Sequence, residues 1–164
     1  MMKAPNLGRL TALVLTAFAA ATPAPGADEA QVSQFKATAV CDACDLSGAD
    51  LSGVVMKSRG SANDANFSGA NLSGASLWNF TMNNANLENA NLEGLDSMNL
   101  QLFKANLSKA NLRNANLRFV NLTEADLSGA DLTGAAIEPD LLTGVAAKLC
   151  NTTMPDGSTN DSGC

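Results

Sequence analysis

The chain contains no histidine and no tyrosine among its 164 residues. The absence of histidine excludes Ser-His-Asp and Cys-His catalysis, histidine-ligated metal centres and haem attachment through a C-x-x-C-H motif. Aromatic residues make up only 4% of the chain, too few for a core built around aromatic rings, whereas 46% apolar residues are too many for disorder. Ten basic residues stand against sixteen acidic ones, a formal net charge of −6, so a basic nucleic-acid-binding face is not expected.

Residues 1–27 have the pattern of an export signal. Lys3 and Arg9 precede an uncharged apolar run from Leu10 to Ala21, and small residues and prolines follow. This run is too short to span a bilayer, which takes about 20 residues, and a buried N-terminal helix explains neither the charges nor the small residues. Cleavage after Ala21 and cleavage after Gly26 both fit the pattern. Loss of the segment removes two basic residues and no acid, which makes the net charge −8.

A five-residue repeat fills most of the remaining chain. From residue 65 to residue 139, fifteen consecutive pentapeptides follow the pattern A-(N/D)-L-x-x without a gap. Leucine is central in eleven of them, and alanine stands two residues earlier in eleven. The same order continues upstream to Ala39, with one residue inserted between Lys57 and Gly60.

A period of five fits neither a straight helix nor a straight strand. On a helix, successive leucines would lie about 140° apart and form no apolar face. On a strand, side chains alternate, so every second leucine would face water. A chain that bends once per repeat removes both objections, because alanine and leucine then point inward, asparagine points outward, and the Ser-Gly pair forms the corner. The sequence therefore predicts an all-β solenoid with pentapeptide sides.

Exceptions to the repeat recur every twenty residues, which is four pentapeptides and favours four-sided coils. They form two columns: Phe80, Leu100 and Val120, and Trp78, Met98 and Arg118. With this sustained A-(N/D)-L-x-x tandem, the chain resembles the pentapeptide-repeat family. The resemblance implies a right-handed quadrilateral β-helix, here of about five coils over residues 39–142. Residues 28–38 are then an N-terminal cap, and residues 143–164 are a C-terminal cap and tail with a disulfide loop.

The four-sided coil makes further predictions. Asparagines 66, 86 and 106, and asparagines 71, 91 and 111, should form outward ladders. Leu95 should fill the gap that Ser97 leaves in a leucine column. Twenty-residue spacing also places Glu93 beside Arg113 and Lys104 beside Glu124. At the ends, we expect Val32 and Phe35 to cover the first coil, and Leu141, Leu142, Val145 and Leu149 to close the last.

Four cysteines in an exported chain indicate two disulfides, with three pairings open. The segment between Cys150 and Cys164 looks like the closing segment of exported pentapeptide-repeat proteins, which favours a bond between these two. Cys41 and Cys44 hold consecutive inward positions and would bridge each other. The alternatives are buried free thiols, a redox C-x-x-C without its βαβ context, and a four-cysteine metal site that needs the two ends of the rod to meet. The sequence predicts neither a metal site nor a cofactor.

Trp78, Met98, Phe103, Arg118 and Phe119 are predicted at outward or corner positions of the middle coils. Exposed apolar side chains beside arginine are typical of a partner-binding surface, although corner aromatics also pack on adjacent turns. The sequence thus predicts an exported, non-enzymatic structural or protein-interaction scaffold with an unknown protein partner in the envelope. It predicts no nucleic-acid partner and no membrane span, and end-to-end coil packing offers a route to a homodimer.

The predicted location is the periplasm or the extracellular space, or the thylakoid lumen in a photosynthetic source. The family resemblance implies one alternative. Some cytosolic pentapeptide-repeat proteins resemble DNA in shape and negative charge and bind DNA gyrase. This alternative applies only if the chain is not exported, because an exported protein does not meet gyrase.

Overall fold

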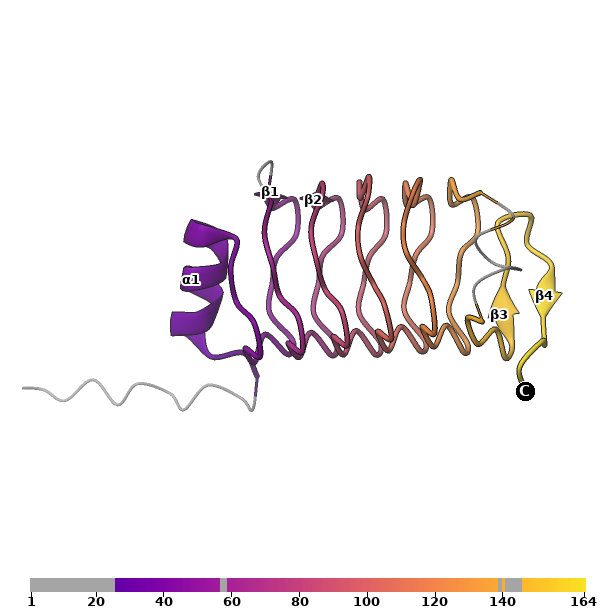
Figure 1. Cartoon of the computed structure of the whole chain (residues 1–164), viewed down its shortest axis with the longest axis horizontal. Helices are drawn as coiled ribbons and strands as arrows, with labels where there is room; N and C mark the ends of the chain where they lie inside the picture. Colours follow the sequence, from indigo (N-terminus) through magenta and orange to yellow (C-terminus); the bar gives the residue numbers. More distant parts are fainter. Residues whose placement is uncertain (1–25, 57–58, 139, 141–145) are drawn as a thin grey trace, which may run out of the picture.

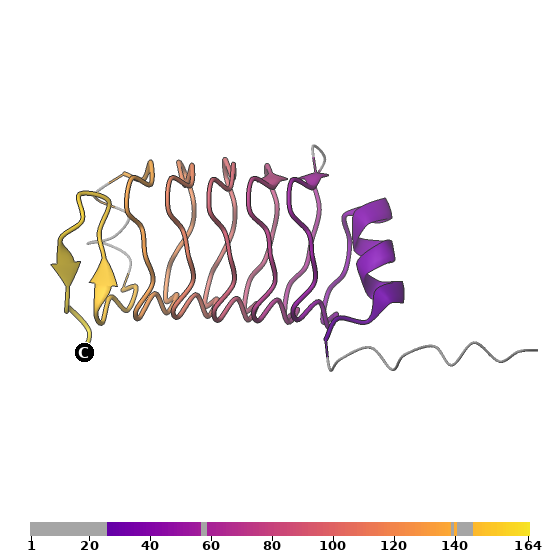
Figure 2. The same cartoon turned by 180° about the vertical axis from the view of Figure 1, so that it is seen from behind.

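The computed structural model describes residues 26–56, 59–138, 140 and 146–164. The predicted export signal lies outside the described residues except for its last two. The described chain is a stack of coils with helix α1 (Glu29–Thr38) against one end and strands β3 (Thr152–Thr153) and β4 (Thr159–Asn160) at the other (Figure 1). Figure 2 shows the same succession of coils from behind.

Parallel β-bridges join each coil to the next along four columns, one for each side of the coil. Most bridged residues are twenty apart, whereas Val55 pairs with Ser76, and Ser61 with both Val40 and Thr81. The extra residue therefore lies between Val55 and Ser61, in agreement with the prediction. The columns contain residues 40, 61, 81, 101 and 121; 45, 66, 86, 106, 126 and 148; 50, 71, 91, 111, 131 and 153; and 55, 76, 96, 116 and 136.

Regular strand is scarce in the described coils. Only β1 (Val55–Met56) and β2 (Ser76–Leu77) pair over two residues, and the other contacts between coils are single bridges. The reason is local, because each side supplies one outward residue to the ladder before the chain turns again. At many corners the second turn residue has a positive φ, as in Gly69 at 65° and Asn84 at 57°.

The interior is filled by the alanines and leucines of the repeat, which are buried. Phe80, Leu100 and Val120 are buried with them in one column. Leu95 and Ser97 are both buried as well, and Ser97 Oγ donates a hydrogen bond to the Asn116 carbonyl at 2.9 Å. The large residue thus replaces alanine where the small one replaces leucine, as predicted. Burying each leucine contributes about 1.5–3 kcal/mol.

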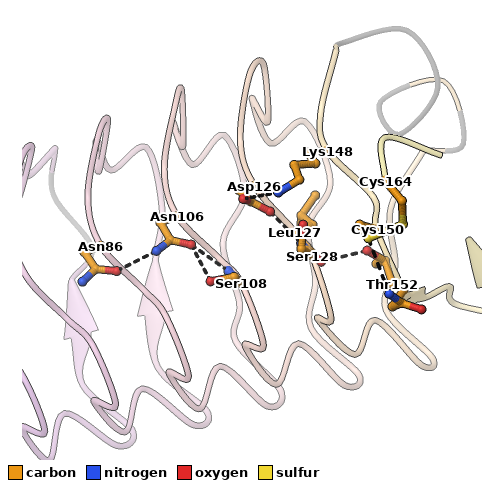
Figure 3. Close-up of polar contacts among 11 residues, drawn as sticks. Asn86, Asn106, Ser108, Asp126, Leu127, Ser128, Lys148, Cys150, Thr152 and Cys164 are labelled. Atoms are coloured by element: carbon orange, nitrogen blue, oxygen red, sulfur yellow. Dashed lines mark hydrogen bonds and ion pairs between the residues drawn. A yellow bond between two sulfur atoms is a disulfide. The ribbon is translucent and has the colours of Figure 1, made fainter. Parts of the chain in front are cut away.

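The outward asparagines form the predicted ladders. Asn86 Nδ2 donates to Asn66 Oδ1 at 3.2 Å. Asn106 Nδ2 donates to Asn86 Oδ1 at 3.1 Å, as Figure 3 shows. Every amide donates toward the N-terminal end, so the first rung needs only an acceptor. Asp45 fills that position and accepts from Asn66 at 3.1 Å. Hydrogen bonds from the side chain and backbone of Ser47 hold the pKa of Asp45 below its ordinary value.

Of the two predicted ion pairs, one is confirmed and one is wrong. Lys104 Nζ lies 3.5 Å from Glu124 Oε2. Arg113 does not pair with Glu93, because its Nη1 lies 3.0 Å from Asp131 Oδ2, a carboxylate of the adjacent ladder. Glu93 instead accepts a hydrogen bond from Asn111 Nδ2 at 3.4 Å.

Helix α1 covers the N-terminal end of the stack. Asp28 caps the helix by accepting from the Ala30 N–H at 2.9 Å. Phe35 is fully buried, and its ring lies edge-on to Phe67 and Phe80 at centroid distances of 5.7 and 5.8 Å. Val32 is partly buried against the same core. At ten residues, α1 does not reach across a bilayer, and no other helix of the described chain has the length and apolar character to do so.

The C-terminal tail continues the stack although it lacks the repeat. Lys148 bridges to Asp126 and Thr153 to Asp131, and β4 then pairs antiparallel with β3. Leu149 is buried, and Thr152 Oγ1 donates to the Leu127 carbonyl at 2.8 Å (Figure 3). The other three residues expected to close the last coil lie outside the described residues: Leu141, Leu142 and Val145.

Candidate functional site

One corner of the coil differs from the other three. It follows the column that contains β1 and β2, along the edge where these strands are labelled in Figure 1. Successive coils are stacked here through their backbones, because the Asn79 N–H donates to the Met98 carbonyl at 2.9 Å and the Asn99 N–H donates to the Arg118 carbonyl at 3.3 Å. Side chains at residues 78, 98 and 118 therefore form a line parallel to the long axis of the stack.

Three large apolar side chains are exposed along this corner, and we call Trp78, Met98 and Phe119 the apolar ridge. Their exposed fractions are 40%, 39% and 62%. Val55, on the adjacent face one coil earlier, is 53% exposed. At the equivalent positions of the other corners, serine, asparagine, glycine and charged residues predominate. An exposed apolar line of this kind is typical of a protein-binding surface.

The ridge is held in a defined shape. Trp78 Nε1 donates to Asp96 Oδ2 at 2.8 Å, and Asp96 Oδ1 accepts from Asn116 Nδ2 at 2.8 Å, so the indole is tied to the next coil. Phe119 has a φ of 59°, a region that bulky side chains rarely occupy. Strain of this kind persists where surrounding structure enforces it. Here the Phe119 N–H is also bound, since it donates to Glu138 Oε2 at 3.3 Å.

The coil of residues 100–119 carries a cation at each of its four corners. Three of them are paired with acids of neighbouring coils: Lys104 with Glu124, Lys109 with Glu88, and Arg113 with Asp131. Within the described part of the chain, Arg118 is in no ion pair. Its position beside Phe119 adds a positive charge to the apolar ridge. A small cavity of about 280 Å³ lies next to it, lined by Arg118, Ala136, Ile137 and Glu138.

The five residues predicted as a partner surface divide between two corners. Trp78, Met98, Arg118 and Phe119 lie together, whereas Phe103 lies at the next corner and is only partly exposed. Phe103 has Lys104 Nζ 5.0 Å from its ring centroid, a cation–π contact. The backbone N–H of Phe103 is also hydrogen-bonded, because it donates to Asn83 Oδ1 at 3.1 Å. Phe103 thus packs locally, while the other four form the ridge and its charge.

Sequence reasoning missed three features of this surface. The first is the exposure of Val55, which its outward repeat position and apolar side chain indicate. The Asp96 bond to Trp78 joins residues eighteen apart, so the twenty-residue spacing does not indicate it. The third feature is the positive φ of Phe119. Its repeat position is the signal that could have found it, because glycine or asparagine takes that position elsewhere.

The cysteines lie at the two ends of the stack. Cys41 is bonded to Cys44 in the first coil, where both are buried, and Cys150 is bonded to Cys164 across the terminal hairpin. Figure 3 shows the second bond beside the last rungs. Within the described ranges, no three His, Cys, Asp or Glu side chains come together in a way that would hold a metal ion.

The match to a family model agrees with the coil geometry. Residues 64–96 and 101–135 match the family model of pentapeptide repeats, in eight copies. A search of curated proteins gave no significant match. Similar solved structures are the pentapeptide repeat protein Rfr23 from the cyanobacterium Cyanothece 51142 and a pentapeptide repeat protein from the Arabidopsis thaliana thylakoid lumen. A third is QnrB1, a plasmid-mediated fluoroquinolone resistance protein.

All three are 22% identical to this chain. Rfr23 aligns over 68% of this chain and 96% of its own, with a TM-score of 0.43. The thylakoid lumen protein aligns over 84% and 78%, with a TM-score of 0.35. QnrB1 aligns over 76% and 80%, with a TM-score of 0.36. The repeat match and the stacked coils, rather than these three alignments, identify the fold.

Proposed function

Because this chain belongs to the pentapeptide-repeat family, we propose that it is a non-enzymatic scaffold, exported to the cell envelope, that binds a protein through the apolar ridge. The observation that carries the proposal is the exposure of Trp78, Met98 and Phe119 at one corner of three successive coils. A rigid stack with one apolar corner and three polar ones presents a single surface to a partner. Tryptophan, methionine and arginine are also the residues that interface cores favour.

The scaffold that presents the ridge is, on this proposal, a right-handed quadrilateral β-helix of about five coils between short caps. The four bridge columns support the four sides, and α1 and the terminal hairpin support the caps. A filled interior supports the absence of catalysis, because the inward positions hold alanine and leucine rather than reactive groups.

Export is supported by the cysteines and by the N-terminal sequence. Cys41–Cys44 and Cys150–Cys164 are disulfides, which persist in oxidising compartments and are rare in the cytosol. Residues 1–27 have the charge and hydropathy of a secretory signal. We propose the periplasm or the extracellular space, or the thylakoid lumen if the source is photosynthetic.

The intact mass of the protein from its native cells tests export, after free thiols are alkylated without reductant. A mass short by the first 21 to 26 residues and free of alkyl groups is expected. A full-length, fully alkylated chain would contradict export. The acidic net charge of −6 would then favour the gyrase-binding DNA mimic that the family suggests.

Binding through the ridge is tested by capture from the native envelope fraction. The double variant Trp78→Ser/Phe119→Ser should lose a protein that the wild type retains. Val40→Ser is the matched control, because Val40 is 45% exposed but belongs to another column. Loss of capture by both variants, or by neither, would contradict a role for the ridge. Circular dichroism should show that both variants keep their coils.

A further inference from the structure

The corner that carries the apolar ridge has five successive rows. Gly60 lies against the ring of Phe80. Arg59 directly precedes Gly60 as Asn79 directly precedes Phe80, so we assign Arg59 to the first row. The second and third rows hold Trp78 and Met98. The fourth holds Arg118 with Phe119, and the fifth holds Glu138, which accepts from the Phe119 N–H. From the N-terminal end, the order is thus cation, tryptophan, methionine, cation with phenylalanine, and anion.

We propose that the partner of this ridge is a second copy of the chain, bound side by side and antiparallel. The inference rests on the proposed function, since it names the occupant of the same surface. A two-fold axis through Met98 places row one opposite row five and row two opposite row four. Arg59 then faces Glu138 of the second copy, Trp78 faces Arg118 and Phe119, and Met98 faces Met98. Every row meets a complementary row, as an isologous interface requires.

The charges select this orientation. In a parallel pair, Arg59, Arg118 and Glu138 would each face their own copy, and like charges at close range oppose binding. In the antiparallel pair, Arg59 and Glu138 form two symmetric ion pairs. Arg118 gains the face of an indole, a cation–π contact. Among the described residues, neither Arg59 nor Arg118 has an ion-pair partner within its own chain.

The rest of the surface confines association to this corner. The chain is acidic overall, with a net charge of −6, so other faces of two copies repel each other. Four rises of about 4.8 Å between five rows give a contact roughly 19 Å long. An interface along one corner is small, and small interfaces give weak dimers.

Sedimentation velocity measures this association directly. The protein is purified as its host produces it and examined from about 1 µM to about 1 mM, the range in which small interfaces dissociate. The salt concentration is about 0.15 M, which screens the net charge beyond about 8 Å. We expect a reversible monomer–dimer equilibrium. Met98→Arg should abolish it, because two guanidinium groups then meet on the axis. Ser52→Arg is the matched control, at the same repeat position of another corner, and should dimerise as the wild type does.

A charge-reversal cycle tests the antiparallel register. Arg59→Glu alone and Glu138→Arg alone should each weaken the dimer by about tenfold or more, because each places two like pairs in the interface. The double variant should dimerise about tenfold more tightly than Glu138→Arg alone, because it restores both pairs with reversed sign while both variants lack the carboxylate that accepts from the Phe119 N–H. An end-to-end dimer would be insensitive to all three variants. No rescue in the double variant would overturn the antiparallel register.

The outcomes separate this inference from the function on which it rests. A wild-type protein that stays monomeric over the whole range, yet loses a captured envelope protein on Trp78→Ser/Phe119→Ser, overturns the second copy as occupant and leaves the scaffold function standing. If the wild type stays monomeric and the Trp78→Ser/Phe119→Ser variant captures the same envelope proteins as the wild type, both the second copy as occupant and the binding function of the ridge are overturned. A dimer that Met98→Arg leaves intact overturns the ridge as its interface.

Discussion

At the scale of single residues, the structure depends on which side chains can both donate and accept a hydrogen bond. An asparagine in the ladder donates its amide to the previous coil and accepts both from the next coil and from a nearby backbone N–H. Asn86 does all three, with Asn66, Asn106 and the Glu88 N–H. Aspartate lacks the donor. Aspartate therefore suits the two ends of a ladder. Asp45, at the start, accepts from Asn66 and has no earlier side chain to which it would donate. Asp126, at the other end, forms an ion pair with Lys148.

Asn86→Asp tests this reading of the ladder. The substitution keeps both acceptor roles of residue 86 but removes its donor. Asn66 Oδ1 is then left with the Ser68 N–H as its one donor, and a half-buried charge is added beside it. We expect a loss of about 1–2 kcal/mol in the free energy of unfolding, measured by urea denaturation. Asn89→Asp makes the same chemical change at an exposed corner and should cost much less. Equal losses in the two variants would mean that the donor contributes nothing.

At the scale of the pentapeptide side, the interior tolerates exchange between neighbouring positions. Most sides place a small alanine and a large leucine inside. In the side that holds Leu95 and Ser97, the large and small residues have changed places, and both are still buried. Ser97 satisfies its hydroxyl through the Asn116 carbonyl. The volume of each side is thus more tightly constrained than the identity of either residue.

A double-mutant cycle at this side makes the exchange measurable. Leu95→Ala leaves a cavity and should cost about 2–5 kcal/mol. Ser97→Leu overpacks the coil and should cost about 1–3 kcal/mol. The double variant restores the pattern of the other sides and should unfold within about 1 kcal/mol of the wild type, which is strong coupling between the two sites. Simple additivity of the two losses in chemical denaturation would show that the side chains do not share one space.

The sequence predicted the elements that depend on periodicity. Spacing and side-chain type predict the four columns and the inserted residue before Ser61. They also predict that the Phe35 side chain of the cap helix is buried against the first coil. The sequence did not predict contacts for which one side chain has two possible partners. Arg113 has two acids within reach, and spacing alone selects Glu93, whereas the long side chain reaches the Asp131 carboxylate in the adjacent ladder.

The candidate site was predictable in part for the same reason. Exposure of Trp78, Met98 and Phe119 follows from their repeat positions. Two other features depend on side-chain conformations, which the period of the repeat does not predict. They are the hydrogen bond from Trp78 to Asp96 and the packing of Phe103 against Lys104. The tail is similar, since Lys148 and Thr153 pair with the last coil without any repeat in their sequence.

At the scale of the whole molecule, the stack is close to one-dimensional. Each coil contacts only the coils before and after it, so stability is approximately a sum of nearest-neighbour terms, and the ends open first. The two ends are closed by different devices. Helix α1 and Cys41–Cys44 protect the first coil, and the β3–β4 hairpin with Cys150–Cys164 protects the last.

Removal of one disulfide should therefore loosen one end only. Cys150→Ser/Cys164→Ser opens a loop with a sequence separation of 14, a loss of about 3 kcal/mol in the chain-entropy model. Hydrogen exchange should show about 100-fold less protection at Gly129 and Leu132, whose N–H groups donate to Cys150 and Thr153. The amides of Asn86 and Asn91 should keep their protection, because two coils separate them from the change. Cys41→Ser/Cys44→Ser is the mirror control and should expose Leu46 and Leu51 instead. Equal loss along the whole stack would show that the coils unfold as one cooperative unit and that nearest-neighbour terms do not describe this protein.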